Sequence, residues 1–240
     1  MKVLLLFLIG ICASRSAAAH DGGAMTVYYE ERAPYQVWAG DTLEGLTGSP
    51  AARAFKAAQL KVVWEASSMS RQLIMLRKNL GPSCVVGWFK TAERQKFAKY
   101  SKALYRDGPV VALVRPDFVF QPGHSVRDTL TTPGVRLLVR TGYVYGAYLD
   151  AQIKQANPAT VSSPLPNSQM SELLLANRAD VMFTTEEEAA QMLRHLGPKA
   201  AALQVRRFSD PVPSESRHIA CSGKVPDATI ERINAALTAD

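Results

Sequence analysis

The chain has 240 residues, of which 28 are lysine or arginine and 21 are aspartate or glutamate, giving a formal net charge of +7. This length exceeds the ~100–150 residues of a typical domain, so it can hold two modest domains or one large core. No run of basic residues is interleaved with aromatic ones, which argues against nucleic-acid binding. The mild positive charge would attract anionic solutes or simply aid solubility.

The beginning of the chain has the pattern of a secretory signal peptide. A basic start leads into an apolar run over residues 3–11, which is shorter than the ~20 residues that span a bilayer, and the run fades into three consecutive alanines. We predict a cleavable signal at 1–19 and a soluble periplasmic product. An isoleucine precedes Cys12, where a lipoprotein signal has a small residue, so a lipid anchor is disfavoured. Cleavage removes two basic residues and no acid, which lowers the net charge from +7 to +5.

The first half of the mature chain alternates apolar runs with helical patterns. Strands are predicted at 25–29, 62–64, 84–87 and 110–114, and helices are predicted from Ser49 and over 70–80. The order β-α-β-α-β predicts a parallel sheet covered by helices. A basic and aromatic stretch over 88–106 precedes the fourth strand.

The second half follows a polar loop over 116–133, where the composition shifts, so a lobe boundary is predicted near Arg115. This half repeats the plan of the first. Its strands are predicted at 135–139, 160–161 and 180–183, and its helices at 145–156, 169–177 and 185–196.

The last segment contains two strand candidates, at 203–208 and 218–222, and a helix that begins at Asp227. These elements are too few for a third domain, so we expect them to return to the first lobe. The predicted division is therefore lobe 1 at 20–114 plus 206–240 and lobe 2 at 115–205. Such a division gives the molecule a two-stranded hinge.

Cleavage of the signal leaves two cysteines, Cys84 and Cys221. In an oxidising compartment such a pair favours a disulfide, although two separate buried thiols are an equally open alternative. The four histidines have no metal-ligand spacing with either cysteine, so neither a metal nor another cofactor is expected.

The segment from Gly87 to Arg94 is the most informative candidate site, because it follows a predicted buried strand. In doubly wound sheets ligands bind just beyond the carboxyl ends of strands. Arg94 could hold a carboxylate through two parallel hydrogen bonds, and Thr91 could add a hydroxyl. The alternative is a surface arginine paired with Glu93.

Four groups of residues, taken in order, resemble the amino-acid-type family of periplasmic solute-binding proteins of ABC transporters. They are Ala33-Pro34-Tyr35, Leu43-Glu44-Gly45-Leu46, Thr91-Ala92-Glu93-Arg94, and Phe97…Ser101…Tyr105. The similarity covers most of the mature chain. It implies an α/β protein of the two-lobed type II periplasmic-binding-protein fold, in which two doubly wound sheets joined by a two-stranded hinge close around a small ligand.

Carried over by position, the resemblance implies that Arg94 binds the carboxylate of the ligand and that Tyr35 covers its apolar side. Tyr143 stands where the family often has a serine or threonine that contacts the ligand. Thr185 stands where the family has the acid that binds an α-amino group, and its neighbour is Glu186. Because Thr185 is neutral, an ammonium would be neutralised only if Glu186 turned in, which puts α-amino-acid binding in doubt.

Phe89, Arg32 and the acidic run 186–188 also lie near this candidate site. Phe89 either makes the site more aromatic or packs as core, and Arg32 stands at a position of a stacking aromatic and could face an anion. The acidic run 186–188 is expected to stabilise the positive end of a helix, with Thr185 and Glu188 forming a capping box. Only Glu186 is kept as a candidate ligand contact.

The sequence contains no Gly-x-Ser-x-Gly elbow, no phosphate-binding glycine loop and no credible Cys–His pair, so no catalytic residues are expected. We therefore predict a non-catalytic, monomeric receptor for a carboxylate or zwitterion that presents its ligand to an ABC permease. Two alternatives stay open. One is an accessory protein that reports ligand occupancy to a membrane sensor, and the other is an enzyme derived from the same fold.

Overall fold

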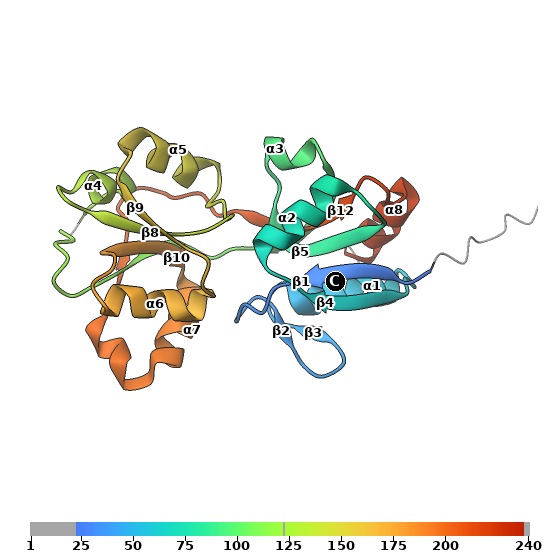
Figure 1. Cartoon of the computed structure of the whole chain (residues 1–240), viewed down its shortest axis with the longest axis horizontal. Helices are drawn as coiled ribbons and strands as arrows, with labels where there is room; N and C mark the ends of the chain where they lie inside the picture. The colour runs from blue at the N-terminus through green and yellow to red at the C-terminus, as the bar shows by residue number, and fades with distance from the viewer. Residues whose placement is uncertain (1–22, 122, 238–240) are drawn as a thin grey trace, which may run out of the picture.

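The structure is a computed structural model that describes residues 23–121 and 123–237. These residues form two lobes, each built on a five-stranded sheet (Figure 1). The predicted signal peptide and its cleavage point lie outside the described residues. No helix of the described part of the chain combines the length and the apolar character needed to cross a membrane.

The two sheets have the same plan of three parallel strands followed by one antiparallel strand and an edge strand. The sheet of lobe 1 has the order β4 (Val62–Ala66), β1 (Met25–Tyr29), β5 (Ser83–Phe89), β12 (Ser216–Ser222) and β6 (Ala98–Arg106). The sheet of lobe 2 has the order β9 (Ala159–Ser163), β8 (Arg136–Arg140), β10 (Val181–Thr185), β7 (Val110–Val114) and β11 (Gln204–Arg207). The predicted pair of doubly wound sheets is therefore confirmed.

Helices cover both faces of each sheet. Lobe 1 contains α1 (Gly48–Ala57), α2 (Met69–Lys78), the short α3 (Ala92–Gln95) and α8 (Asp227–Ala236), together with a small hairpin of β2 (Val37–Trp38) and β3 (Leu43–Glu44). Lobe 2 contains α4 (Val126–Thr131), α5 (Ala147–Ala156), α6 (Asn167–Leu175), α7 (Glu186–Leu196) and the 3-10 helix η1 (Gly197–Ala202). Most of the predicted elements are present within a few residues of their predicted limits.

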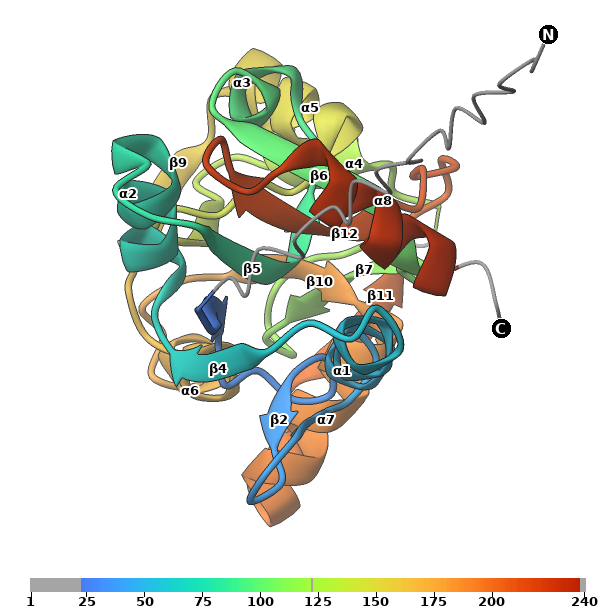
Figure 2. The same cartoon turned by 90° about the vertical axis from the view of Figure 1, so that its right-hand side faces the viewer.

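The alternation of side chains along each strand decides which helices cover which face. In lobe 1, Val27 packs in the core that contains α1 and α8, whereas the next residue, Tyr28, packs with α2 on the opposite face. Figure 2 shows α2 on one side of the sheet and α1 and α8 on the other. In lobe 2, Leu137 packs with α4 and α5, and Leu138 packs with α6 and α7.

The chain crosses between the lobes twice, at 107–109 and 208–215 (Figure 1). The two crossing segments are bonded to each other where the backbone N–H of Asp107 donates to the carbonyl of Glu215 at 2.9 Å. The strand at 110–114 pairs with β10 and β11, so it belongs to the sheet of lobe 2. We therefore place the first lobe boundary at 107–109 instead of near Arg115, and the second after β11 instead of between 205 and 206.

A disulfide joins Cys84 and Cys221, which decides between the two alternatives for this pair. The bond links β5 to β12 at directly opposed positions in the core of lobe 1, where neither cysteine is exposed. The two cysteines are 137 residues apart in the sequence. The bond therefore ties the returning end of the chain to lobe 1, and closing so long a loop stabilises the fold by restricting the unfolded chain.

Candidate functional site

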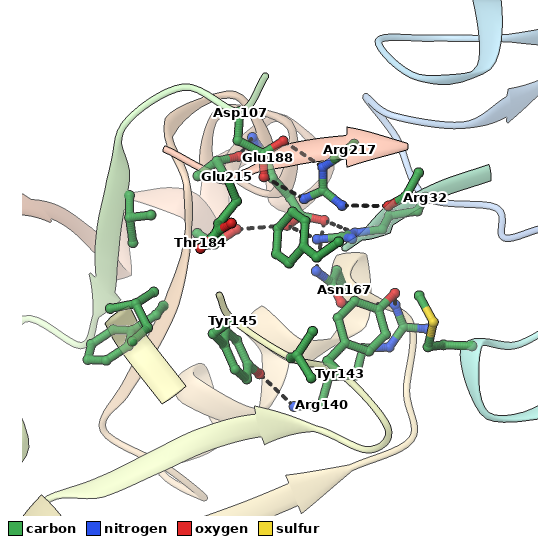
Figure 3. Close-up of a pocket in the computed structure, with 18 of the residues that line it drawn as sticks. Arg32, Asp107, Arg140, Tyr143, Tyr145, Asn167, Thr184, Glu188, Glu215 and Arg217 are labelled. Carbon is green, nitrogen blue, oxygen red and sulfur yellow. Dashed lines mark hydrogen bonds and ion pairs between the residues drawn. The ribbon is translucent and has the colours of Figure 1, made fainter. Parts of the chain in front are cut away.

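A cavity lies between the lobes, at the carboxyl ends of the parallel strands (Figure 3). Its empty space is about 750 Å³, a figure that includes the opening to solvent. The lining residue at the end of β5 is Phe89, at the end of β8 it is Arg140, and at the end of β10 it is Thr185. Strand ends of both sheets therefore converge on one cleft, as expected for doubly wound sheets.

Gly87 shapes the end of β5. Its backbone has a φ of +77°, a conformation that L side chains rarely adopt, and a Cβ at this position would lie 2.8 Å from the side-chain amide of Gln36. The backbone conformation favours glycine here, and any side chain would also have to displace the amide of Gln36. The chain then places Trp88 in the core and Phe89 at the cavity wall.

Arg94 lies in the cleft without an acidic partner. It follows the N-cap of α3, where the hydroxyl of Thr91 accepts a hydrogen bond from the backbone of Arg94 at 3.2 Å. The residue is only 6% exposed, and its guanidinium lies 4.3 Å from the ring centre of Trp88. One Nη atom donates to the carbonyl of Phe89 at 3.4 Å, and no carboxylate of the described residues forms an ion pair with it. Burial lowers the pKa of Arg94 below its ordinary value.

Arg32 also lies in the cleft, but it is fully paired. Two of its nitrogens donate to the two carboxylate oxygens of Glu188, at 2.6 and 2.7 Å. Glu188 also accepts from Asn167 at 2.7 Å and from Thr184 at 2.8 Å, so all of its neighbours stabilise the charged form. Burial opposes the ionisation of Glu188, but Arg32 and Thr184 more than offset it and hold its pKa below the ordinary range.

Two tyrosine rings complete the surroundings of Arg32. Its guanidinium carbon lies 4.9 Å from the ring centre of Tyr35 and 5.0 Å from that of Tyr143, close enough for cation–π attraction. Tyr35 belongs to lobe 1, whereas Tyr143 and Glu188 belong to lobe 2. A cation cage of two aromatic rings and one carboxylate, assembled from both lobes, is therefore filled by an arginine of the protein itself. Figure 3 shows Arg32, Tyr143 and Glu188 of this cage.

Two further ion pairs border the cavity. Arg140 of lobe 2 donates to Glu30 of lobe 1 at 2.7 Å, and the hydroxyl of Tyr143 is also bonded to Glu30. Near the hinge, Arg217 donates to both carboxylate oxygens of Asp107, one of them at 2.7 Å. The pairs made by Arg32 and Arg140 join the lobes, so the structure represents a closed arrangement.

The structure brings four of the seven candidate ligand residues to the cavity wall. They are Phe89, Arg94, Tyr143 and Thr185. Tyr35 is fully buried beside the cavity, where its hydroxyl is 2.6 Å from the hydroxyl oxygen of Thr185.

The other two candidates lie elsewhere. Thr91 caps α3, and Glu186 faces the surface, where it pairs with Arg207 at 2.5 Å. Thr185 does cap α7 as predicted, by accepting from the backbone of Glu188 at 3.3 Å. The side chain of Glu188, however, turns to Arg32 and not back to the cap.

The site contains further charged or polar residues that were not among the candidates. They include Glu30, Asp107, Arg140, Asn167, Thr184, Glu188, Glu215 and Arg217. A signal for two of them was present in the sequence, because Glu30 and Arg140 come directly after the predicted strands at 25–29 and 135–139. A charged residue at the end of a buried parallel strand is itself a site indicator.

Neither a protein-family model nor a curated protein sequence matches this chain. Solved structures do match it in three dimensions. An ancestral arginine-binding protein bound to arginine has a TM-score of 0.70 and 20% sequence identity, covering 91% of this chain and 92% of its own. The chain has the type II periplasmic-binding-protein fold.

Two more structures with this fold carry different descriptions. One, described for glutathione import via GshT and the cystine ABC importer TcyBC of Streptococcus mutans, has a TM-score of 0.70 and 16% identity over 89% of this chain and 88% of that one. The other is an ancestral amino acid-binding protein, AncCDT-1, described as a precursor of cyclohexadienyl dehydratase, with a TM-score of 0.64 and 19% identity over 90% of this chain and 88% of that one. At these identities the likeness establishes the type II fold.

Proposed function

We propose that the protein is a periplasmic solute-binding receptor whose lobes close around a small carboxylate-bearing metabolite. The observation that carries this proposal is the buried guanidinium of Arg94, which faces the cleft and has no acidic partner among the described residues. A buried unpaired cation costs several kcal/mol, and a fold retains one where a ligand neutralises it. The solved structures with this fold are of binding proteins, which supports the proposal of a solute-binding receptor.

Closure in this proposal is a shift between open and closed populations. The ligand contacts lobe 1 through Arg94 and Phe89, and it contacts lobe 2 through the wall that contains Tyr143. The ion pairs of Arg32 with Glu188 and of Arg140 with Glu30 form only when the lobes meet. Contacts made only in the closed form shift the population toward it, and the bound ligand adds to them.

Binding without turnover is part of the proposal. A catalytic acid or base needs a free carboxylate or imidazole that can reach the substrate. Three acids of the described residues line the cleft: Asp107 and Glu188 each have both oxygens held by an arginine, and Glu215 accepts the backbone N–H of Ala147. The relation of AncCDT-1 to a dehydratase makes turnover worth testing, by following the bound metabolite over time in solution with the purified protein.

The partner in this proposal is an ABC permease that receives the ligand from the closed receptor. One structure with the same fold was described together with an ABC importer, which supports this choice of partner. A membrane sensor that reads the closed form would need the same two lobes. Reconstitution with the candidate permease in vesicles distinguishes a permease partner from a sensor partner, because only a permease gives ligand uptake that depends on this protein.

The test begins with the small molecules released from the purified protein, identified by mass spectrometry. Titration of the released carboxylate into wild-type protein and into the Arg94→Ala variant is then followed by calorimetry. We expect the variant to lose about 2–4 kcal/mol of binding free energy, roughly 30- to 1,000-fold in Kd, because a carboxylate is left unpaired in a closed cleft.

The Arg77→Ala variant is the matched control for that titration. Arg77 pairs with Glu93 at 2.6 Å beside α3, but both side chains are exposed. Loss of an exposed pair should leave Kd unchanged. Equal affinities of wild-type protein and the Arg94→Ala variant would overturn the assignment of Arg94 to the ligand.

A further inference from the structure

The cation cage of the cleft is occupied by the protein itself. Arg32 lies between the rings of Tyr35 and Tyr143, at 4.9 and 5.0 Å, and is bonded to both oxygens of Glu188. The side-chain exposures of Arg32 and Glu188 are 10% and 1%, so water does not screen this pair. An ammonium group of a ligand would have to displace a guanidinium that already makes both bonds and both ring contacts.

Thr185, which lies beside this cage, has a neutral side chain and cannot neutralise a charged group of a ligand. In the amino-acid-type solute-binding proteins that the sequence resembles, an acid at this position binds an α-amino group. The hydroxyl of Thr185 is already bonded to that of Tyr35 at 2.6 Å. The same oxygen accepts the backbone N–H of Glu188. The neighbouring acid, Glu186, pairs with Arg207 at the surface.

The remaining acids that line the cavity are also engaged. Both oxygens of Asp107 are held by Arg217. Glu215 forms no ion pair with a basic residue of the described part of the chain, and its Oε1 accepts the backbone N–H of Ala147 at 3.1 Å, at the positive end of α5. Among the three acids of the described residues that line the cavity, Glu215 is the one without an arginine partner, so the experiment below includes it as the group that would accept an ammonium.

Besides Arg94 and these engaged groups, the cavity lining contains a set of apolar side chains. The side chains of this set come from both lobes: Phe89, Val110, Val144, Leu149, Met182 and Phe183. Leu149, Met182 and Phe183 are each 3% exposed, so this part of the cavity wall is continuous with the core of lobe 2. A wall of this kind favours a hydrocarbon body and penalises a polar one.

We propose that the cleft selects carboxylates with an apolar body and no ammonium group, because Arg32 occupies the place in which an amine would be neutralised. This inference rests on the proposed function, since it takes the cleft as the binding site and Arg94 as the group that binds the carboxylate. It adds the chemical class of the ligand. The same arrangement excludes zwitterionic amino acids by leaving their positive charge unpaired beside Arg94.

Matched pairs of ligands that differ only in the amine test the inference on wild-type protein. The pairs are 3-phenylpropanoate with L-phenylalanine and 4-methylpentanoate with L-leucine, each measured by calorimetry at pH 7. We expect the member without the amine to bind at least tenfold tighter in one pair or both. Equal or tighter binding of the amino acids would overturn the inference while leaving the proposed function intact.

Absence of binding by every member would overturn the stated ligand class. The proposed function would then be judged separately, by whether Arg94→Ala weakens binding of the small molecule released from the protein. If amino acids bind, the Glu215→Gln variant shows whether Glu215 is the group that accepts the amine. In that case the amino acids alone lose affinity, and the inference is overturned with its cause identified.

The Arg32→Gln variant tests the cause of the selectivity. Removal of the guanidinium frees Glu188 to pair with a ligand amine, so we expect the preference within each pair to shrink at least tenfold. The matched control is Arg207→Gln, because Arg207 pairs with Glu186 in the same first turn of α7 but at the surface. A folded Arg32→Gln protein with unchanged preference would overturn the role of Arg32, and if this variant does not fold, the matched pairs on wild-type protein still decide the inference.

Discussion

The two ends of the cleft each bury an arginine, but only one of these arginines is paired with an acid of the described residues. At the carboxylate end, formed by Trp88, Phe89 and Arg94, a guanidinium is buried against a ring without an acid. At the paired end, formed around Arg32 and Glu188, a guanidinium is buried with two oxygens and two rings around it. Burial alone does not distinguish a structural arginine from a binding one, but the presence of a partner does.

The pKa values of the two arginines follow the same contrast. Burial lowers the pKa of Arg94, and the opposing attraction of Tyr100, Asp150 and Glu93 does not offset the loss of water. Burial also opposes the charge of Arg32, but Glu188 and the nearby tyrosines more than offset it, so the pKa of Arg32 is raised. The paired end is therefore complete without a ligand, whereas the carboxylate end is completed by one.

The largest expected effect comes from breaking the paired end. The Glu188→Ala variant leaves Arg32 buried without a partner and should lower the free energy of unfolding by about 3 kcal/mol. This is the low end of the range for a broken buried pair, because the lobes can open and return Arg32 to water. Urea unfolding followed by circular dichroism measures the change.

A second pair on the same helix turn provides the control for Glu188→Ala. Glu186 pairs with Arg207, whose side chain is 78% exposed, so Glu186→Ala should leave the urea midpoint within the error of measurement. Equal losses of unfolding free energy in Glu188→Ala and Glu186→Ala would mean that the buried pair contributes no more than the exposed one. The contrast between the two ends would then be wrong.

The stabilisation that Glu188 provides at the paired end should depend on pH. Because the pKa of Glu188 is lowered in the folded protein, its contribution is complete above its ordinary pKa of ~4.3 and is lost as the pH falls through the folded value. The difference in unfolding free energy between wild-type protein and Glu188→Gln should therefore be constant from pH 7 to pH 5 and shrink toward pH 3. A difference that stays constant down to pH 3 would contradict the lowered pKa.

The sequence predicted the fold well because the sheet periodicity is local. The strands at 25–29 and 135–139 and the helix at 185–196 could each be recognised from their own residues. The strand β6 was missed because its basic side chains, among them Lys99 and Lys102, interrupt the apolar pattern. The placement of 110–114 in lobe 1 failed because an apolar strand does not reveal which sheet it joins.

The site was predicted only where its signal was local as well. Arg94 could be recognised from the strand and turn that precede it, and the structure places it in the cleft. Glu188 was attributed to the helix terminus, because its partner Arg32 is 156 residues away in the sequence. Ion pairs between lobes depend on how the two sheets face each other, and no local pattern contains that information.

The smallest expected effect on stability lies at the carboxylate end. Arg94→Met keeps the length of the side chain and removes a buried charge that no acid of the described residues compensates. The lost attraction to Trp88, worth about 0.5–1 kcal/mol, opposes the relief of that buried charge. We expect the free energy of unfolding, measured without ligand, to stay within about 1 kcal/mol of the wild-type value while carboxylate binding is lost. A loss as large as that of Glu188→Ala would make Arg94 a structural residue, and the two ends of the cleft would no longer differ in kind.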